Sequence, residues 1–151
     1  MMTVASTCRR RRGFSLIELA AALAVLAILT AIAVPAWQRH LARGWRAQAR
    51  AALTGAMLQR ERHALEALTF AAAPGSDVVA GEWPLRVPAS GPVRHLVNAG
   101  ACPQATLDTC VELRATPQAA DPECGTLILR STGQWLAQPE GTVPQPLPPH
   151  C

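Results

Sequence analysis

The cysteines can take part in more kinds of chemistry than the other side chains of this sequence. A thiolate can bind zinc or pair with a second cysteine in a disulfide, and structural zinc sites use closely spaced ligand pairs. No two cysteines are spaced as Cys-x-x-Cys and the histidines are scattered, which argues against a metal site. In an exported chain the last four cysteines would form two disulfides, with three pairings open. The residues concerned are Cys8, Cys102, Cys110, Cys124 and Cys151, with His40, His63, His95 and His150.

Glu18 is the second group with unusual chemistry, because its carboxylate lies in otherwise apolar sequence. A charged side chain within a membrane costs on the order of 2.5 to 3.5 kcal/mol even on the milder insertion scales. Glu18 therefore needs either a partner of opposite charge or a place in the lipid headgroup layer.

Enzyme motifs are missing from the rest of the sequence. There is no Gly-x-Ser-x-Gly elbow, no phosphate-binding glycine loop and no carboxylate pair with a supporting motif. We expect no catalytic activity, no cofactor and no metal.

Glu18 lies directly before an apolar run from Leu19 to Trp37, and the structure of this run therefore determines the position of Glu18. The run contains no charged residue. At about 1.5 Å per residue it is long enough for a helix to cross a hydrocarbon layer of roughly 30 Å. Four arginines, Arg9 to Arg12, precede it and hold the N-terminus in the cytoplasm. An ordinary removable signal peptide shares this pattern, but an acid near the start of the apolar run, such as Glu18, argues against it.

The net charge of +4 comes from the same arginines. After Arg12 the chain has ten arginines and ten acids, so that part is formally neutral. A neutral domain without a basic and aromatic cluster gives little support to direct nucleic-acid binding.

The segment from Arg12 to Leu19, which reads RGFSLIEL, resembles the cleavage and methylation motif of type IV prepilins. Pro35 falls where helices of that family have a kink proline, and the PAWQ that begins there is similar to their usual PSYQ. The resemblance implies that prepilin peptidase cuts between Gly13 and Phe14 and methylates the new N-terminal Phe14. Residues 1–13 would be a removed cytoplasmic leader, and residues 14–37 a transmembrane helix that later lies in the filament core.

Such a cut would give Glu18 a partner. It frees the α-amine of Phe14, and in a filament the amine of one subunit could approach Glu18 of its neighbour, so that both charges are neutralised where water is excluded. In the alternative, Glu18 lies in the headgroup layer.

Beyond Pro35 the sequence predicts an amphipathic continuation of the helix over residues 38–73. Apolar residues recur at spacings of three, four or seven, and the helix should run to about Phe70, before the breakers Pro74 and Gly75. The recurring residues are Leu53, Met57, Ala64 and Leu68. Four arginines form a stripe on this helix, which could meet lipid phosphates, acids of a neighbouring subunit, or only water. They are Arg39, Arg43, Arg46 and Arg50.

Residues 74–151 change to short β-prone segments separated by proline, glycine and aspartate. They predict an antiparallel sheet with one face on the amphipathic part of the helix and the other toward water. The last stretch, Pro139 to Cys151, is too rich in proline for a sheet interior and should lie over the surface. The candidate strands are Trp83–Val87, Val93–Val97, Val111–Ala115 and Thr126–Arg130.

The segment from Ala115 to Leu127, with its Asp-Pro-Glu-Cys-Gly, is similar to the C-terminal hairpin of PilE-like minor pilins. The resemblance implies a bridge from Cys124 to Cys151, which leaves Cys102 to pair with Cys110. It also implies an α+β type IV pilin fold, in which a long N-terminal helix packs on a small antiparallel sheet with a disulfide-pinned C-terminal region.

The function implied is that of a minor type IV pilin, a structural subunit with a part in pilus assembly, adhesion, twitching motility or DNA uptake. Its partners would be prepilin peptidase, other pilin subunits and the inner-membrane assembly platform. The chain would be single-pass in the bacterial inner membrane before assembly and extracellular in the pilus afterwards. Two alternatives stay open, a type II secretion pseudopilin and a membrane-anchored module that binds DNA or a surface.

Overall fold

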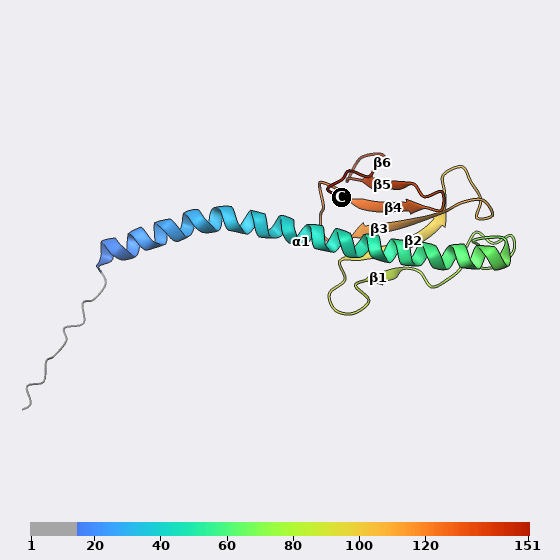
Figure 1. Ribbon diagram of the computed structural model, residues 1–151, viewed down its shortest axis with the longest axis horizontal. Coiled ribbons are helices and arrows are strands. Elements are labelled where there is room, and N and C mark those ends of the chain that lie inside the picture. The colour runs from blue at the N-terminus through green and yellow to red at the C-terminus, as the bar shows by residue number, and fades with distance from the viewer. Residues whose placement is uncertain (1–14) are drawn as a thin grey trace, which may run out of the picture. The chain divides into compact units, whose positions relative to one another are not determined.

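The computed structural model describes residues 15–151. It has one long helix, α1 (Leu16–Ala67), followed by six strands (Figure 1). The chain divides into two compact units, one ending at Arg39 and one from His40 to Cys151. The first part of α1 belongs to the first unit, and its second part belongs to the second.

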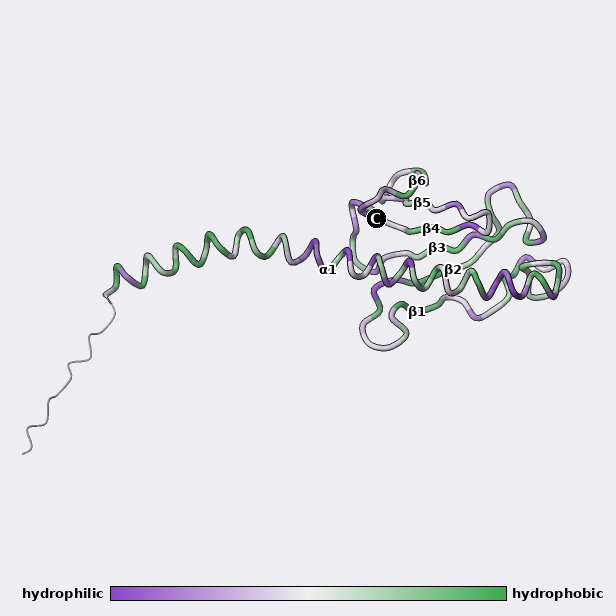
Figure 2. The backbone as a smooth tube through the Cα atoms, in the orientation of Figure 1, coloured by the Kyte–Doolittle hydropathy of each residue, from purple (hydrophilic) through white to green (hydrophobic). Residues whose placement is uncertain are grey.

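The first part of α1 is apolar and uncovered. Every residue from 15 to 39 is exposed, and Figure 2 shows this stretch as mostly hydrophobic. Among the described residues, α1 is the one helix long and apolar enough to cross a membrane. Pro35 lies inside this helix, and the kink expected there stays a prediction.

The second part of α1 ends at Ala67, three residues before the predicted Phe70. Leu68 has a φ of 59° and donates its backbone N–H to the Ala64 carbonyl at 2.9 Å, which is a left-handed helix cap. Residues 70–80 then form a loop that folds back on itself. The Ala80 N–H donates a hydrogen bond of 2.9 Å to the Phe70 carbonyl and closes this loop. Leu68 was expected on the buried face, but its side chain is 83 % exposed because the chain leaves the helix there.

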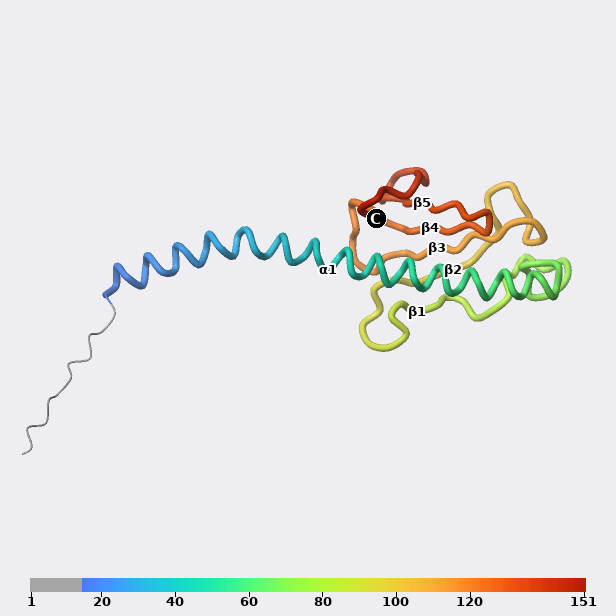
Figure 3. Tube along the Cα trace, viewed as in Figure 1, coloured from blue at the N-terminus to red at the C-terminus, as the bar shows by residue number. Residues whose placement is uncertain are grey.

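The strands form one antiparallel sheet in the order β1 to β6, so each strand pairs with the next along the chain. Short connections make neighbours in sequence neighbours in space (Figure 3). The strands are β1 (Leu85–Val87), β2 (His95–Ala101), β3 (Val111–Pro117), β4 (Thr126–Arg130), β5 (Trp135–Gln138) and β6 (Gln145–Pro146).

The predicted strands at Val111 and Thr126 correspond to β3 and β4, although β3 runs two residues further, to Pro117. The first two predicted strands begin two residues later than expected, at Leu85 and His95. β5 and β6 were not predicted. The proline-rich tail contributes only the two-residue edge strand β6, which agrees with its exclusion from a sheet interior.

The core lies between one sheet face and the second part of α1, as predicted. The helix supplies Leu53 and Met57, and the strands supply fully buried side chains such as Val97, Leu113 and Leu127. Burying each of the larger aliphatic side chains stabilises the fold by roughly 1.5 to 3 kcal/mol.

The other sheet face is not simply open to water. Ile128 on this face is fully buried, beside its strand neighbour Arg114. The guanidinium of Arg114 donates to Glu112 at 2.8 Å and also to Gln138, while Arg130 donates to Glu112 at 2.7 Å. Long polar side chains therefore cover the apolar atoms of this face.

Candidate functional site

The start of α1 is held by a cap that the sequence pattern S-x-x-E could have revealed. The Ser15 hydroxyl accepts a hydrogen bond from the Ile17 N–H at 3.3 Å, and the Ser15 carbonyl accepts the first helical bond, from Leu19, at 3.1 Å. Glu18 stands three positions after Ser15, where glutamate favours helix formation. Glu18 thus has a structural use in addition to the pairing predicted for it.

The proposed cleavage site, Gly13 and Phe14, lies outside the described residues, as does Cys8. The described helix begins at Leu16, directly after that site. Glu18 and Pro35 both lie in the apolar part of α1, on the exposed surface of the first unit.

Arg46 joins the helix to two distant parts of the chain. Its side chain is 6 % exposed. The guanidinium donates to both carboxylate oxygens of Asp121, from Nε at 2.8 Å and from Nη2 at 2.6 Å, and Nη2 also lies 2.9 Å from Glu123. Nη1 donates to the His150 carbonyl at 3.5 Å. One helical side chain therefore ties down both the β3–β4 connection and the C-terminal tail.

The predicted arginine stripe is therefore divided. Arg46 does not face lipid phosphates or acids of another subunit, as the stripe was expected to do. It is buried and paired with acids of its own chain. Arg50 is exposed, and its guanidinium lies 5.7 Å from the centre of the Trp135 ring. Arg43 is exposed and makes no hydrogen bond or ion pair within residues 15–151.

The disulfides join the pairs that the resemblance implies. Cys124 bonds Cys151 with a Cα–Cα distance of 5.7 Å, and Cys102 bonds Cys110 at 5.5 Å. Gly125 after the first bridge has a φ of 57°, and a Cβ there would come within 2.1 Å of the Gln138 carbonyl oxygen. Only glycine therefore allows the β3–β4 connection to approach β5 so closely.

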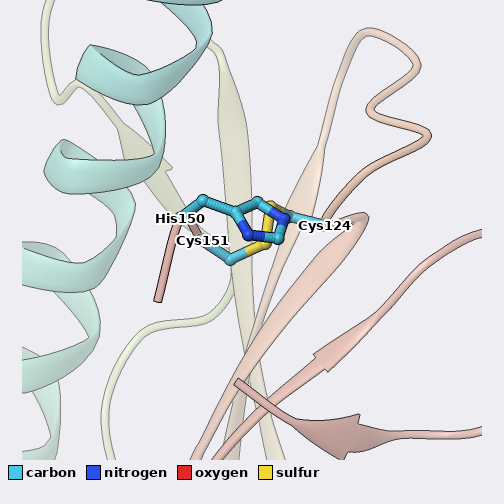
Figure 4. Close-up of side chains that lie close together, drawn as sticks. All are labelled: Cys124, His150 and Cys151. Atoms are coloured by element: carbon cyan, nitrogen blue, oxygen red, sulfur yellow. A yellow bond between two sulfur atoms is a disulfide. The ribbon is translucent and has the colours of Figure 1, made fainter. Parts of the chain in front are cut away.

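The imidazole of His150 lies beside this bridge (Figure 4). Its ring and the two sulfurs of Cys124 and Cys151 are within 4.8 Å of one another. The sulfurs are bonded to each other, so they are not thiolates and cannot serve as zinc ligands. In the structure these cysteines close the tail onto the connection.

His95 is buried next to the same cluster, at the start of β2. It is 3 % exposed, and neither of its ring nitrogens has a hydrogen-bond partner among the described residues. Burial lowers the pKa of His95 below its usual value; the Asp121 carboxylate opposes this shift and the Arg46 guanidinium adds to it. Burial would raise the pKa of Asp121, but hydrogen bonds from Arg46 and from the Cys124 N–H outweigh it and hold that pKa below the usual value.

These two shifts predict a loss of stability on acidification in two stages. A depressed pKa gives stability that is present above the ordinary pKa and is lost as the pH falls through the native value. For His95 the loss should begin near pH 6.5, and for Asp121 below about pH 3.8. Urea unfolding of the detergent-solubilised protein from pH 8 to pH 3 measures both stages. His95→Leu should remove the first stage and leave the second, and an unchanged first stage in that variant would contradict the assignment.

The bridges should differ in their contribution to stability. In the chain-entropy relation, a loop of 27 residues gives about 3.5 kcal/mol and a loop of 8 residues about 2.5 kcal/mol. We expect Cys124→Ser with Cys151→Ser to lower the free energy of unfolding more than Cys102→Ser with Cys110→Ser does. Chemical denaturation of both variants tests this order. Non-reducing peptide mapping tests the pairing, and a Cys110–Cys124 peptide would contradict it.

Sequence reasoning identified the cysteines and Glu18 but missed Arg46, Asp121 and His95 as a cluster. One signal for Arg46 was available, since it precedes the core residues Ala49 and Leu53 by three and seven positions and so shares their helix face. No spacing rule reveals that Asp121 is its partner, because the two are 75 residues apart.

Comparison with known proteins gives a match near the N-terminal end of the chain. Residues 8–34 match the family model of the prokaryotic N-terminal methylation motif. No curated protein and no solved structure matches the chain. The matched residues include the proposed cleavage site, the capped start of α1 and most of its apolar part.

Proposed function

We propose that this chain, a subunit of the type IV pilin and pseudopilin class, is a minor pilin of a type IV pilus. One observation carries the proposal: the methylation motif over residues 8–34 leads directly into an exposed apolar helix, which continues into a disulfide-closed α+β unit. This arrangement fits the type IV pilin fold.

In the proposed maturation, prepilin peptidase cuts after Gly13 on the cytoplasmic side and methylates Phe14. Residues 14–37 then anchor the chain in the inner membrane, with the unit from His40 onward in the periplasm. The assembly platform moves the subunit into a filament, where other pilins cover its apolar helix. Every residue from 15 to 39 is exposed within a single chain, so an isolated subunit needs lipid or other helices around it.

A pilus is favoured over a type II secretion pseudopilus by the disulfide-closed hairpin. The Cys124–Cys151 bridge closes the tail over the β3–β4 connection, as in the PilE-like resemblance. Arg46 holds both segments to the helix. Adhesion, twitching motility and DNA uptake are roles that this assignment would imply.

The proposal is tested by purifying sheared filaments and determining the N-terminus of the chain by mass spectrometry. We expect the chain in the filament fraction, beginning at methylated Phe14. Gly13→Leu is the control, because a side chain at the cut should keep the chain at precursor length and out of filaments. A filament fraction without this chain, or normal trimming of Gly13→Leu, would contradict the proposal.

A further inference from the structure

The C-terminal tail carries a histidine next to the cysteine that joins it to the rest of the chain. The ring of His150 and the sulfurs of Cys124 and Cys151 all lie within 4.8 Å of one another (Figure 4). Both cysteines are buried, whereas His150 is exposed. An imidazole can accept a proton near neutral pH, and a thiol must lose its proton before it can form a disulfide. The imidazole therefore lies where a base could help this bridge to form.

The second bridge has no comparable neighbour. Within residues 15–151, no histidine or carboxylate forms such a group with Cys102 and Cys110. These two cysteines are only 8 residues apart, and the Cys102 N–H donates to the Cys110 carbonyl at 3.3 Å. The backbone thus brings their thiols together. Cys124 and Cys151 are 27 residues apart and lack this advantage.

One ion pair holds the main chain on both sides of the longer bridge. The Asp121 carboxylate accepts a hydrogen bond from the Cys124 N–H at 3.2 Å. Arg46, which is paired with Asp121, donates to the His150 carbonyl at 3.5 Å. These contacts use backbone groups of the two segments, so they can form before the sulfurs are joined. A tail that docks through them brings the imidazole back to Cys124.

We propose that His150 is the general base that closes the Cys124–Cys151 bridge. The oxidant is a donor disulfide, of a protein or of glutathione. The Cys151 thiolate attacks the donor, forms a mixed disulfide and releases one donor thiolate. His150 then takes the proton of the Cys124 thiol, and the Cys124 sulfur attacks the Cys151 sulfur. The second donor sulfur leaves as a thiolate and takes up that proton, so the two cysteines are oxidised and the donor is reduced to two thiols.

The order of the two attacks follows from where the sulfurs lie. Cys124 is fully buried and belongs to the connection between two paired strands, β3 and β4. Cys151 belongs to the proline-rich tail, which adds only the two-residue strand β6 to the sheet. A tail that has not yet docked therefore offers Cys151 to a bulky donor more readily than the sheet offers Cys124. The base and the sulfur that is attacked then arrive together on one segment.

The test measures the closure rate of each bridge in the full chain, with Cys8→Ser to remove the leader thiol. The detergent-solubilised protein is reduced, freed of reductant and mixed with excess glutathione disulfide, and acid-quenched samples are mapped by mass spectrometry. At pH 7 a thiol is only a few per cent thiolate. His150→Gln should therefore slow closure of the Cys124–Cys151 bridge on the order of tenfold, with glutathione accumulating on Cys151. The Cys102–Cys110 bridge of the same molecules is the control and should keep its rate.

Two further measurements separate proton transfer from placement of the tail. At about pH 9.5 most thiols are ionised without a base, so His150→Gln should close at nearly the parental rate there. His150→Arg keeps a positive charge but cannot accept a proton. At neutral pH it should close as slowly as His150→Gln.

Four results would overturn the assignment of His150 as the base. They are a parental rate for either variant at neutral pH, a defect of His150→Gln that persists at high pH, equal slowing of both bridges, and glutathione on Cys124 in place of Cys151. The assay involves no filaments, so its result is independent of the proposed pilus role.

Discussion

Replacing Arg46 with alanine should lower the free energy of unfolding by about 3 kcal/mol, the low end of the cost of breaking a buried ion pair. Its side chain is 6 % exposed, and that of its main partner Asp121 is 12 % exposed. The variant leaves the Asp121 carboxylate in a largely buried site with the backbone N–H groups of Glu123 and Cys124 as its donors. Glu123 is 52 % exposed, so its contact with Arg46 adds little because water screens it.

The measurement is urea unfolding of the detergent-solubilised protein at pH 7, with both disulfides intact. Arg43→Ala is the matched control, since Arg43 is an exposed arginine one turn earlier on the same helix. It should change stability by no more than about 0.5 kcal/mol. Equal losses for the two variants would mean that the arginines act together at the surface, and the Arg46 cluster would then have no special role.

The effect of pH on Arg46→Ala gives an independent check of the same cluster. The depressed pKa of Asp121 depends on hydrogen bonds from Arg46. Without the guanidinium, burial raises that pKa, so acidification should cost the variant less additional stability below about pH 3.8 than it costs the parent.

The helix and part of the sheet were predictable from the sequence because local patterns encode them. Apolar residues without charge marked the first part of α1, and β-prone segments between turn residues marked β3 and β4. The helix end was placed three residues too late because Leu68 is a good helix former, and the left-handed cap that stops the helix there has no glycine signal. β5 is only four residues long and β6 only two, which is too short for a periodic pattern.

The site was less predictable because its contacts join distant segments. The arginine stripe has a regular spacing, but spacing alone cannot show which arginine faces the core and finds an acid 75 residues away. The outer sheet face presents a related difficulty. Ile128 breaks the expected pattern of polar residues there, and it is buried because the long side chains around it reach across the sheet.

The presence of Glu18 has two physical explanations, and they predict different behaviour for its variants. Glu18 is the third residue after the Ser15 cap, where a side chain that reaches back to the backbone N–H of the cap stabilises the start of a helix, and glutamine can do this as well as glutamate. As the partner of the Phe14 amine it needs its negative charge, which glutamine lacks. The pair Glu18→Gln and Glu18→Ala therefore separates capping from charge.

If the charge matters, Glu18→Gln and Glu18→Ala should both nearly disappear from sheared filaments. Each leaves the α-amine of Phe14 charged and unpaired among apolar helices, a loss of roughly 3 to 5 kcal/mol, which corresponds to at least about a hundredfold. Membrane insertion should not fall, because removing a carboxylate makes the apolar run more favourable for the bilayer. The thermal stability of the unit from His40 onward should stay within about 0.5 kcal/mol, since Glu18 lies outside it.

The test compares the membrane and sheared-filament amounts of both variants with those of the parent. Normal incorporation of Glu18→Gln with loss of Glu18→Ala would show that capping is what matters, and normal incorporation of both would place Glu18 in the headgroup layer.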